Sequence, residues 1–134
     1  MGKITVINIK NEDKSLEPGY FYVGRSAKYS SPLANPYTHN GKRSNLAKLS
    51  FKTREQAIEA YEKYFDVMYN EDEEFKKAFD EIYETYKSGE DIYLGCFCAP
   101  QPCHADYIAK KLQQKLIKEN REKFLKEKNI FRKY

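Results

Sequence analysis

The residues best suited to chemistry lie close together in one stretch, Ile92–Ile108. It contains all three cysteines of the chain and one of its two histidines: Cys96, Cys98, Cys103 and His104. Thiols and imidazoles serve in proteins as nucleophiles, general bases and metal ligands. A hydrophobic run precedes these residues, two prolines lie among them, and a helical pattern follows. We therefore expect a strand, a rigid turn and a helix, with the reactive groups at the joint.

Anion binding is the first chemistry that this joint permits. Backbone N–H groups in the first turn of a helix hold phosphate or carboxylate, and the helix dipole strengthens the attraction. Arg25 and Arg54 can add bidentate charge-assisted bonds, and Asn35 can bind an amide or hydroxyl group. Such a set suits a nucleotide-like small molecule. Three aromatic residues offer a flat surface for its base: Tyr22, Tyr37 and Phe97.

The cysteines permit two further chemistries. A cysteine beside a histidine at a helix N-terminus is a usable nucleophile, which makes Cys103 and His104 candidate catalytic residues. Adjacent helical residues point about 100° apart, however, so the two side chains need not touch. A zinc site is the other option, with four ligands: Cys96, Cys98, Cys103 and His104. Because the spacing differs from two Cys-x2-Cys pairs, we expect no cofactor and keep zinc as the alternative. The cysteines can also be small buried hydrophobic residues.

Strands and helices elsewhere in the chain must position these groups. Alternating β-branched residues predict strands over 4–10 and 20–24, and an apolar run predicts a third over 91–98. Apolar stripes at helical spacing predict helices over 53–68 and 75–86, and a third helix after the turn. This order predicts an α/β fold: a small layered domain whose central three- or four-stranded sheet is flanked by helices. The sequence leaves open whether the first two strands form an antiparallel hairpin.

Two strand ends carry the candidate residues. Ligands of such folds lie beyond the carboxyl ends of the strands. Gly24–Arg25 ends the second strand, and Cys98–Ala99 ends the third. Residues 26–52 form a long segment of weak periodicity, which we interpret as a functional loop and not as a plain connection. The sequence therefore predicts one pocket at the strand ends.

Composition and charge exclude several classes of protein. The chain has 134 residues, of which 40% are hydrophobic and 33% charged, and its net charge of +4 does not by itself argue for nucleic acid. We expect one α/β domain over 1–114 and a basic helical tail over 115–134. No apolar run approaches the roughly 20 residues of a membrane span, so we expect no membrane partner. The first ten residues are typical of a strand and not of a signal peptide, which predicts a reducing cytoplasmic location.

The tail has a composition of its own. From Lys115 onwards, basic residues outnumber acidic ones by eight to three. We interpret this segment as a solvated helix with a few docking residues. A partner-binding arm and a surface for anionic polymers are the alternatives.

Four segments together resemble a domain-of-unknown-function family of small bacterial and phage proteins. They are YVGR (22–25), SPLANPY (31–37), REQAI (54–58) with Tyr61, and CFCAPQPCHAD (96–106). The likeness runs from about residue 21 to residue 112. The usual members have tryptophan where Phe97 stands and a shorter segment before the last strand. The resemblance implies no settled reaction, but it implies that nine residues belong together: Arg25, Ser31, Asn35, Arg54, Cys96, Cys98, Cys103, His104 and Asp106.

We therefore expect a cytoplasmic domain that binds a phosphate-bearing, nucleotide-like small molecule. The expected ligand-binding residues are Arg25, Ser31, Asn35, Arg54, Cys98, Cys103, His104 and Asp106. By analogy with phage members, the protein would sequester a nucleotide signal of host defence in the host cytoplasm. Two alternatives stay open: an enzyme that acts on nucleotides or nucleosides through Cys103 or His104, and a zinc-dependent structural or nucleic-acid-binding module. We expect no nucleic-acid partner for the leading hypothesis, and a homo-oligomer stays open.

Overall fold

The protein folds as an α/β domain in which a three-stranded parallel sheet packs against three helices, as the sequence predicted. The computed structural model describes residues 2–25, 30–38, 49–50, 53–96 and 103–132, and every structural statement here concerns these residues. The sheet has the strand order β1-β5-β2. Its strands are β1 (Ile4–Asn8), β2 (Tyr20–Tyr22) and β5 (Ile92–Cys96).

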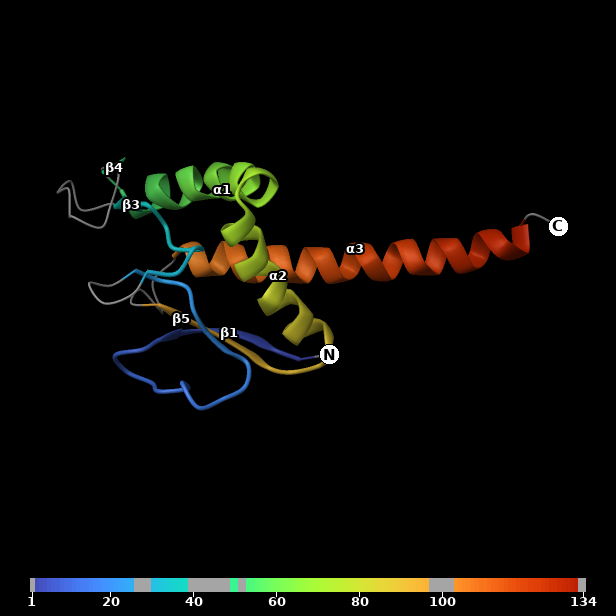
Figure 1. Ribbon diagram of the computed structural model, residues 1–134, viewed down its shortest axis with the longest axis horizontal. Helices are drawn as coiled ribbons and strands as arrows, with labels where there is room; N and C mark the ends of the chain where they lie inside the picture. Colours follow the sequence, from blue (N-terminus) through green and yellow to red (C-terminus); the bar gives the residue numbers. More distant parts are fainter. Residues whose placement is uncertain (1, 26–29, 39–48, 51–52, 97–102, 133–134) are drawn as a thin grey trace.

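Three helices lie on the same side of this sheet (Figure 1). They are α1 (Arg54–Glu71), α2 (Glu73–Lys87) and α3 (His104–Arg132). Two short strands, β3 (Tyr37–Thr38) and β4 (Leu49–Ser50), form a separate parallel pair within the segment that we expected to be a loop. None of the described helices combines the length and the apolar character that crossing a bilayer requires.

Helix ends follow the local sequence closely. A capping box is present at the start of α1, where the Gln56 backbone N–H donates to the Thr53 hydroxyl at 3.1 Å and the Thr53 N–H donates back to the Gln56 side chain. Asp72 caps α2 by accepting a hydrogen bond from the Phe75 N–H at 3.0 Å. Gly89, with a φ of 101°, follows the end of α2 as a glycine C-cap does.

The last strand, β5, lies in the middle of the sheet. Ile4 of β1 pairs with Ile92, and Tyr20 of β2 pairs with Tyr93, both in parallel. The first two strands are therefore neighbours of β5 and not of each other, which answers the question about a hairpin. Gly95 leaves room for the Tyr20 side chain to lie over β5, since a Cβ at this position would be only 2.9 Å from the Tyr20 hydroxyl. Because all strands run the same way, their carboxyl ends meet at one edge.

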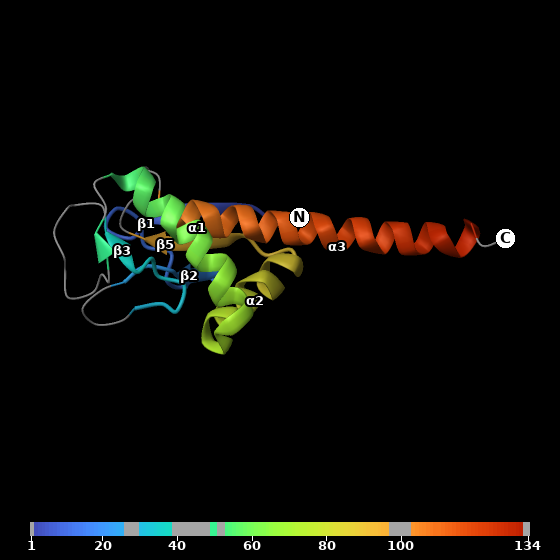
Figure 2. The ribbon, with the colours of Figure 1, turned by 90° about the horizontal axis from the view of Figure 1, so that it is seen from above.

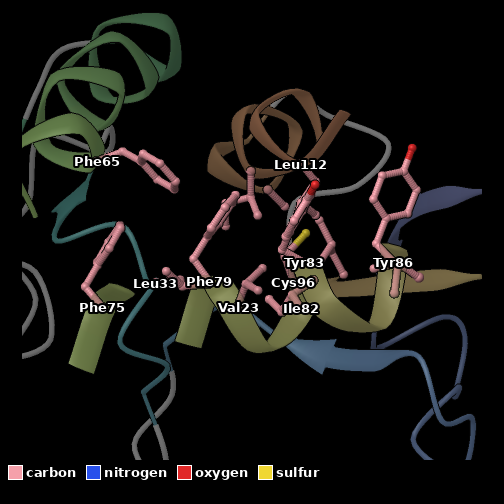
Figure 3. Packing of buried hydrophobic residues seen from close by; sticks show 14 of the residues in the cluster. Val23, Leu33, Phe65, Phe75, Phe79, Ile82, Tyr83, Tyr86, Cys96 and Leu112 are labelled. Carbon is pink, nitrogen blue, oxygen red and sulfur yellow. The ribbon is translucent and has the colours of Figure 1, made fainter. Parts of the chain in front are cut away.

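Aromatic side chains fill the space between the helices. Phe65 of α1 lies edge-on to Phe75 and Phe79 of α2, with ring centroids 5.0 and 5.2 Å apart. Figure 3 shows Phe79 and Tyr83 extending from α2 towards Leu112 of α3. This packing fixes the three helices to one another and so holds the start of α3 against the sheet.

Helix α3 extends far beyond the rest of the molecule (Figures 1 and 2). As far as Lys128, Leu116 is the last residue on this helix that is buried in the core. Beyond it, three large apolar side chains are more than half exposed: Ile117, Phe124 and Leu125. Residues 115–132 of the expected basic tail continue the same helix without a break.

Candidate functional site

The candidate site begins where the carboxyl ends of the strands meet. The Val23 N–H donates to the Gly95 carbonyl at 3.0 Å, and the Ile9 N–H donates to the Cys96 carbonyl at 3.0 Å. These bonds extend the ladders just past the ends of β2 and β1. Helix α3 starts beside this edge, so the backbone at the end of β2 and the first turn of α3 lie against each other.

His104 connects α3 to β2. Its Nε2 atom lies 2.5 Å from the Val23 carbonyl oxygen, and its ring is edge-on to Tyr61 at 5.0 Å between centroids. Because a carbonyl only accepts hydrogen bonds, Nε2 carries the proton and donates it. Burial lowers the pKa of His104, the hydrogen bond to the Val23 carbonyl opposes this shift, and the nearby charge of Arg25 adds to it, so that the pKa is about 4. The imidazole is therefore neutral near pH 7, and Nδ1 is its proton-accepting atom.

The segment of residues 31–35 packs against the end of β2. The Ser31 N–H donates to the Gly24 carbonyl at 3.0 Å, and the Ser31 hydroxyl accepts from the Leu33 N–H at 3.1 Å. The Arg25 guanidinium donates through Nη1 to the backbone carbonyl of Asn35. These contacts hold the arginine at the strand end and give the segment a fixed shape.

Helix α1 anchors the same segment from the other side. The Tyr61 hydroxyl donates to the Leu33 carbonyl at 2.6 Å, and burial raises the pKa of that hydroxyl well above its usual value. The Asn35 side-chain amide donates to the Ala57 carbonyl at 3.4 Å. Arg54 lies one turn before Ala57, at the start of α1. The site is thus built on a strand end, a fixed segment and two helices.

The two described cysteines face each other across the joint between β5 and α3. The Sγ atoms of Cys96 and Cys103 are 3.4 Å apart, and neither residue is in a disulfide. Asp106 accepts a hydrogen bond from the Cys103 N–H at 2.9 Å, as a capping carboxylate does at a helix start. No group of three metal-ligating side chains occurs within the described ranges, where His104 Nε2 is directed to Val23. The predicted zinc ligand Cys98 lies outside those ranges.

Comparison with known proteins places the chain in a family. Residues 7–114 match the family model of a domain of unknown function, DUF4326. The chain belongs to the DUF4326 family. No curated protein and no solved structure matches the chain. The match begins within β1 and ends on α3 before the helix leaves the body of the domain, so the DUF4326 domain contains the whole candidate site.

Most of the predicted site residues of this DUF4326 domain lie in one connected cluster. Hydrogen bonds or close contacts link six of them directly to the strand ends or the α3 start: Arg25, Ser31, Asn35, Cys103, His104 and Asp106. Phe97 and Cys98 lie outside the described residues, as does the side chain of Tyr37. The Tyr22 ring lies over Gly24, where an added Cβ would be 3.0 Å from the tyrosine hydroxyl.

Sequence reasoning missed part of the framework of the DUF4326 site. Periodicity assigned Tyr61 to the apolar core stripe, which is correct for its ring but overlooks the hydroxyl bond to Leu33. The Val23 carbonyl, which accepts the hydrogen bond from His104 Nε2, belongs to the backbone. No pattern of side chains in the sequence could therefore have indicated it. Only the family resemblance grouped Tyr61 with the other motif residues, and it gave no reason for the grouping.

Proposed function

We propose that this DUF4326 domain binds a phosphate-bearing, nucleotide-like small molecule at the carboxyl edge of its sheet. One observation carries the proposal. Tyrosine and cysteine apart, only three polar side chains are buried among the residues whose burial the structure describes, and all belong to the cluster at this edge: Ser31, Asn35 and His104. Burying polar groups costs free energy unless they are hydrogen-bonded. Their concentration at one place, within an otherwise apolar core, is typical of a binding site.

Charge supports an anionic ligand. Arg25 lies partly buried at the end of β2, where its bond to the Asn35 carbonyl fixes the direction of the guanidinium. A guanidinium in a fixed direction is suited to bidentate phosphate binding. The first turn of α3 begins at His104, close enough to Arg25 for the arginine charge to lower the pKa of that histidine. Helix N-termini attract anions, so both features favour a phosphate at the same place.

The site residues favour a protein that binds its ligand without converting it chemically. His104 donates its Nε2 proton to a backbone carbonyl, and the Cys103 thiol is buried against Cys96. Neither group is placed as an exposed nucleophile. In this proposal a DUF4326 protein of phage origin acts by sequestering a nucleotide signal of host defence in the host cytoplasm.

Calorimetric titration tests the binding proposal. The probes are adenosine and guanosine mono-, di- and triphosphates, with the unphosphorylated nucleosides as negative controls. We expect Arg25→Ala to weaken binding of the best phosphate by about tenfold or more, because a charge-assisted bond contributes about 1.5–3 kcal/mol. Arg121→Ala removes the same charge from the exposed part of α3 and serves as the matched control. Equal binding by wild type and Arg25→Ala would refute the site.

A catalytic role is the second candidate, and one observation favours it. The Nε2–H of His104 donates to the Val23 carbonyl, which fixes the tautomer of the imidazole and leaves Nδ1 as the atom that can accept a proton. In this version His104 is a general base, or Cys103 a nucleophile, in a reaction on nucleotides or nucleosides. Chromatography of a bound nucleotide after hours of incubation distinguishes the two candidates. A ligand recovered unchanged counts against catalysis.

A further inference from the structure

The pair of thiols between β5 and α3 has no part in the proposed binding of a phosphate. Cys96 is the last residue of β5, and Cys103 directly precedes α3, seven positions later in the chain. We propose that Cys96 and Cys103 are a redox-modification site: a dithiol that hydrogen peroxide converts to a reversible intramolecular disulfide. This inference does not depend on the identity of the ligand.

The arrangement of the two sulfur atoms carries the inference. Their separation of 3.4 Å is a van der Waals contact, so a disulfide of about 2.05 Å requires only a small approach. Both ends of the pair are held: Cys96 pairs with Asn8 of β1 and its carbonyl accepts from the Ile9 N–H, and the Cys103 N–H donates to Asp106. Each thiol therefore has its partner in place before any oxidant arrives, which favours a bond within this pair.

Burial determines which oxidant fits. Cys96 and Cys103 are only 1% and 3% exposed, so a bulky disulfide such as oxidised glutathione has little access to either sulfur. Hydrogen peroxide is hardly larger than water and can enter during brief local opening at the strand end. Without such an oxidant, a reducing compartment keeps both groups as thiols.

The reaction balances in two steps. One thiolate attacks a peroxide oxygen, the O–O bond breaks, and a sulfenic acid and hydroxide form. The second thiolate then attacks the sulfenic sulfur, so that the S–S bond forms and the S–O bond breaks with release of hydroxide. The hydroxides take up the two thiol protons. In total two thiols and one hydrogen peroxide give one disulfide and two waters, and a dithiol reductant reverses the oxidation.

Closure of the disulfide would act on the start of α3. Cys103 is adjacent to His104, whose Nε2 atom bonds to the Val23 carbonyl. A covalent link from Cys96 to Cys103 fixes the α3 start to the end of β5. We expect the oxidised protein to melt at a higher temperature than the reduced protein, because a disulfide restricts the unfolded chain.

Peroxide treatment of the intact chain, followed by alkylation and mass spectrometry, tests the proposal. The folded protein is oxidised with hydrogen peroxide, and a maleimide then counts the remaining thiols after unfolding. We expect two of the three thiols to be lost and a Cys96–Cys103 crosslink in the peptide map, both reversed by dithiothreitol. The variant Cys98→Ser is the matched control and should form the same crosslink to the same extent. Cys103→Ser should form no crosslink.

Three results would overturn the proposal. One is a crosslink that contains Cys98 in the folded wild-type protein. Another is the survival of all three thiols at a peroxide concentration that oxidises a free cysteine. The third is one zinc ion per chain in elemental analysis whose removal is needed before peroxide acts, since metal-bound thiolates would then define the site. The wild-type and Cys98→Ser results decide the matter even if Cys103→Ser fails to fold.

Discussion

The aromatic core between the helices and the polar cluster at the sheet edge are both buried, but different interactions hold them. The core consists of ring-on-ring contacts, such as Phe65 against Phe75 and Phe79, which depend on volume and shape. The cluster depends on single hydrogen bonds to backbone carbonyls, such as His104 to Val23 and Tyr61 to Leu33. The core therefore sets the stability of the domain, whereas the cluster sets the shape of one edge.

The largest effect should come from the core. Phe65→Ala removes a buried ring at the meeting point of three helices and should lower the free energy of unfolding by about 4 kcal/mol. Urea denaturation followed by circular dichroism measures the change. Val67→Ala, a truncation at an exposed position on the same helix, is the control and should cost less than about 1 kcal/mol. Similar losses in both variants would mean that the aromatic core does not dominate stability.

The contribution of the polar cluster to the free energy of unfolding should depend on pH. The pKa of His104 is about 4 in the folded protein and 6.5 in the unfolded chain, so between these values only the unfolded chain binds the proton. The contribution of neutral His104 to the free energy of unfolding is complete above pH 6.5. It falls by about 3 kcal/mol in total as the pH is lowered to 4. Urea titrations at several pH values measure it. His104→Gln should remove this part of the pH dependence, and an unchanged slope in that variant would contradict the assignment.

Removal of one tyrosine hydroxyl should cost more stability in the polar cluster than in the aromatic core. Tyr61→Phe keeps the ring in the core but leaves the buried Leu33 carbonyl without its donor, at a cost of about 2 kcal/mol. Thermal unfolding measures the loss. Tyr86→Phe is the control in the core, because Figure 3 shows its hydroxyl pointing away from the packed rings. If Tyr86→Phe is the more damaging variant, the hydrogen bond to Leu33 does not hold the cluster.

Removal of residues 121–134 should have the smallest effect. These residues follow Glu119, whose carboxylate accepts a hydrogen bond from Tyr83 and pairs with Lys87, so the truncation keeps those contacts. We expect the stability to change by less than about 0.5 kcal/mol, as for surface changes in general. Differential scanning calorimetry measures it. A large loss would mean that the projecting helix stabilises the domain, for example through a second copy of the chain.

Periodicity and capping residues predicted the elements well because these signals are local. The box of Thr53 and Gln56 and the glycine after α2 mark helix ends without reference to the rest of the chain. The first two predicted strands were too long by two residues each at the site. The first strand ends at Asn8, whose side chain accepts from the Lys10 N–H and starts a turn.

The arrangement of the site could not be predicted in the same way. His104 and Val23 are 81 positions apart in the sequence. Their hydrogen bond exists only because β5 lies beside β2 and is followed by the start of α3. The pairing of β5 with both earlier strands is likewise a long-range choice that no local pattern expresses. Local patterns placed Gly24–Arg25 at the end of the second strand, whereas the predicted strand end at Cys98–Ala99 lies outside the described residues. Tertiary packing determined which atoms meet.

Nuclear magnetic resonance titration tests the central claim most directly. Backbone amide signals of the labelled protein are followed while the best nucleoside phosphate from the calorimetric panel is added. We predict saturable shifts at Val23, Arg25 and His104, and none at Phe124 on the projecting helix. Shifts centred instead on the groove of about 430 Å³ between α1, α2 and α3, which Tyr69 and Lys115 help to line, would contradict the account.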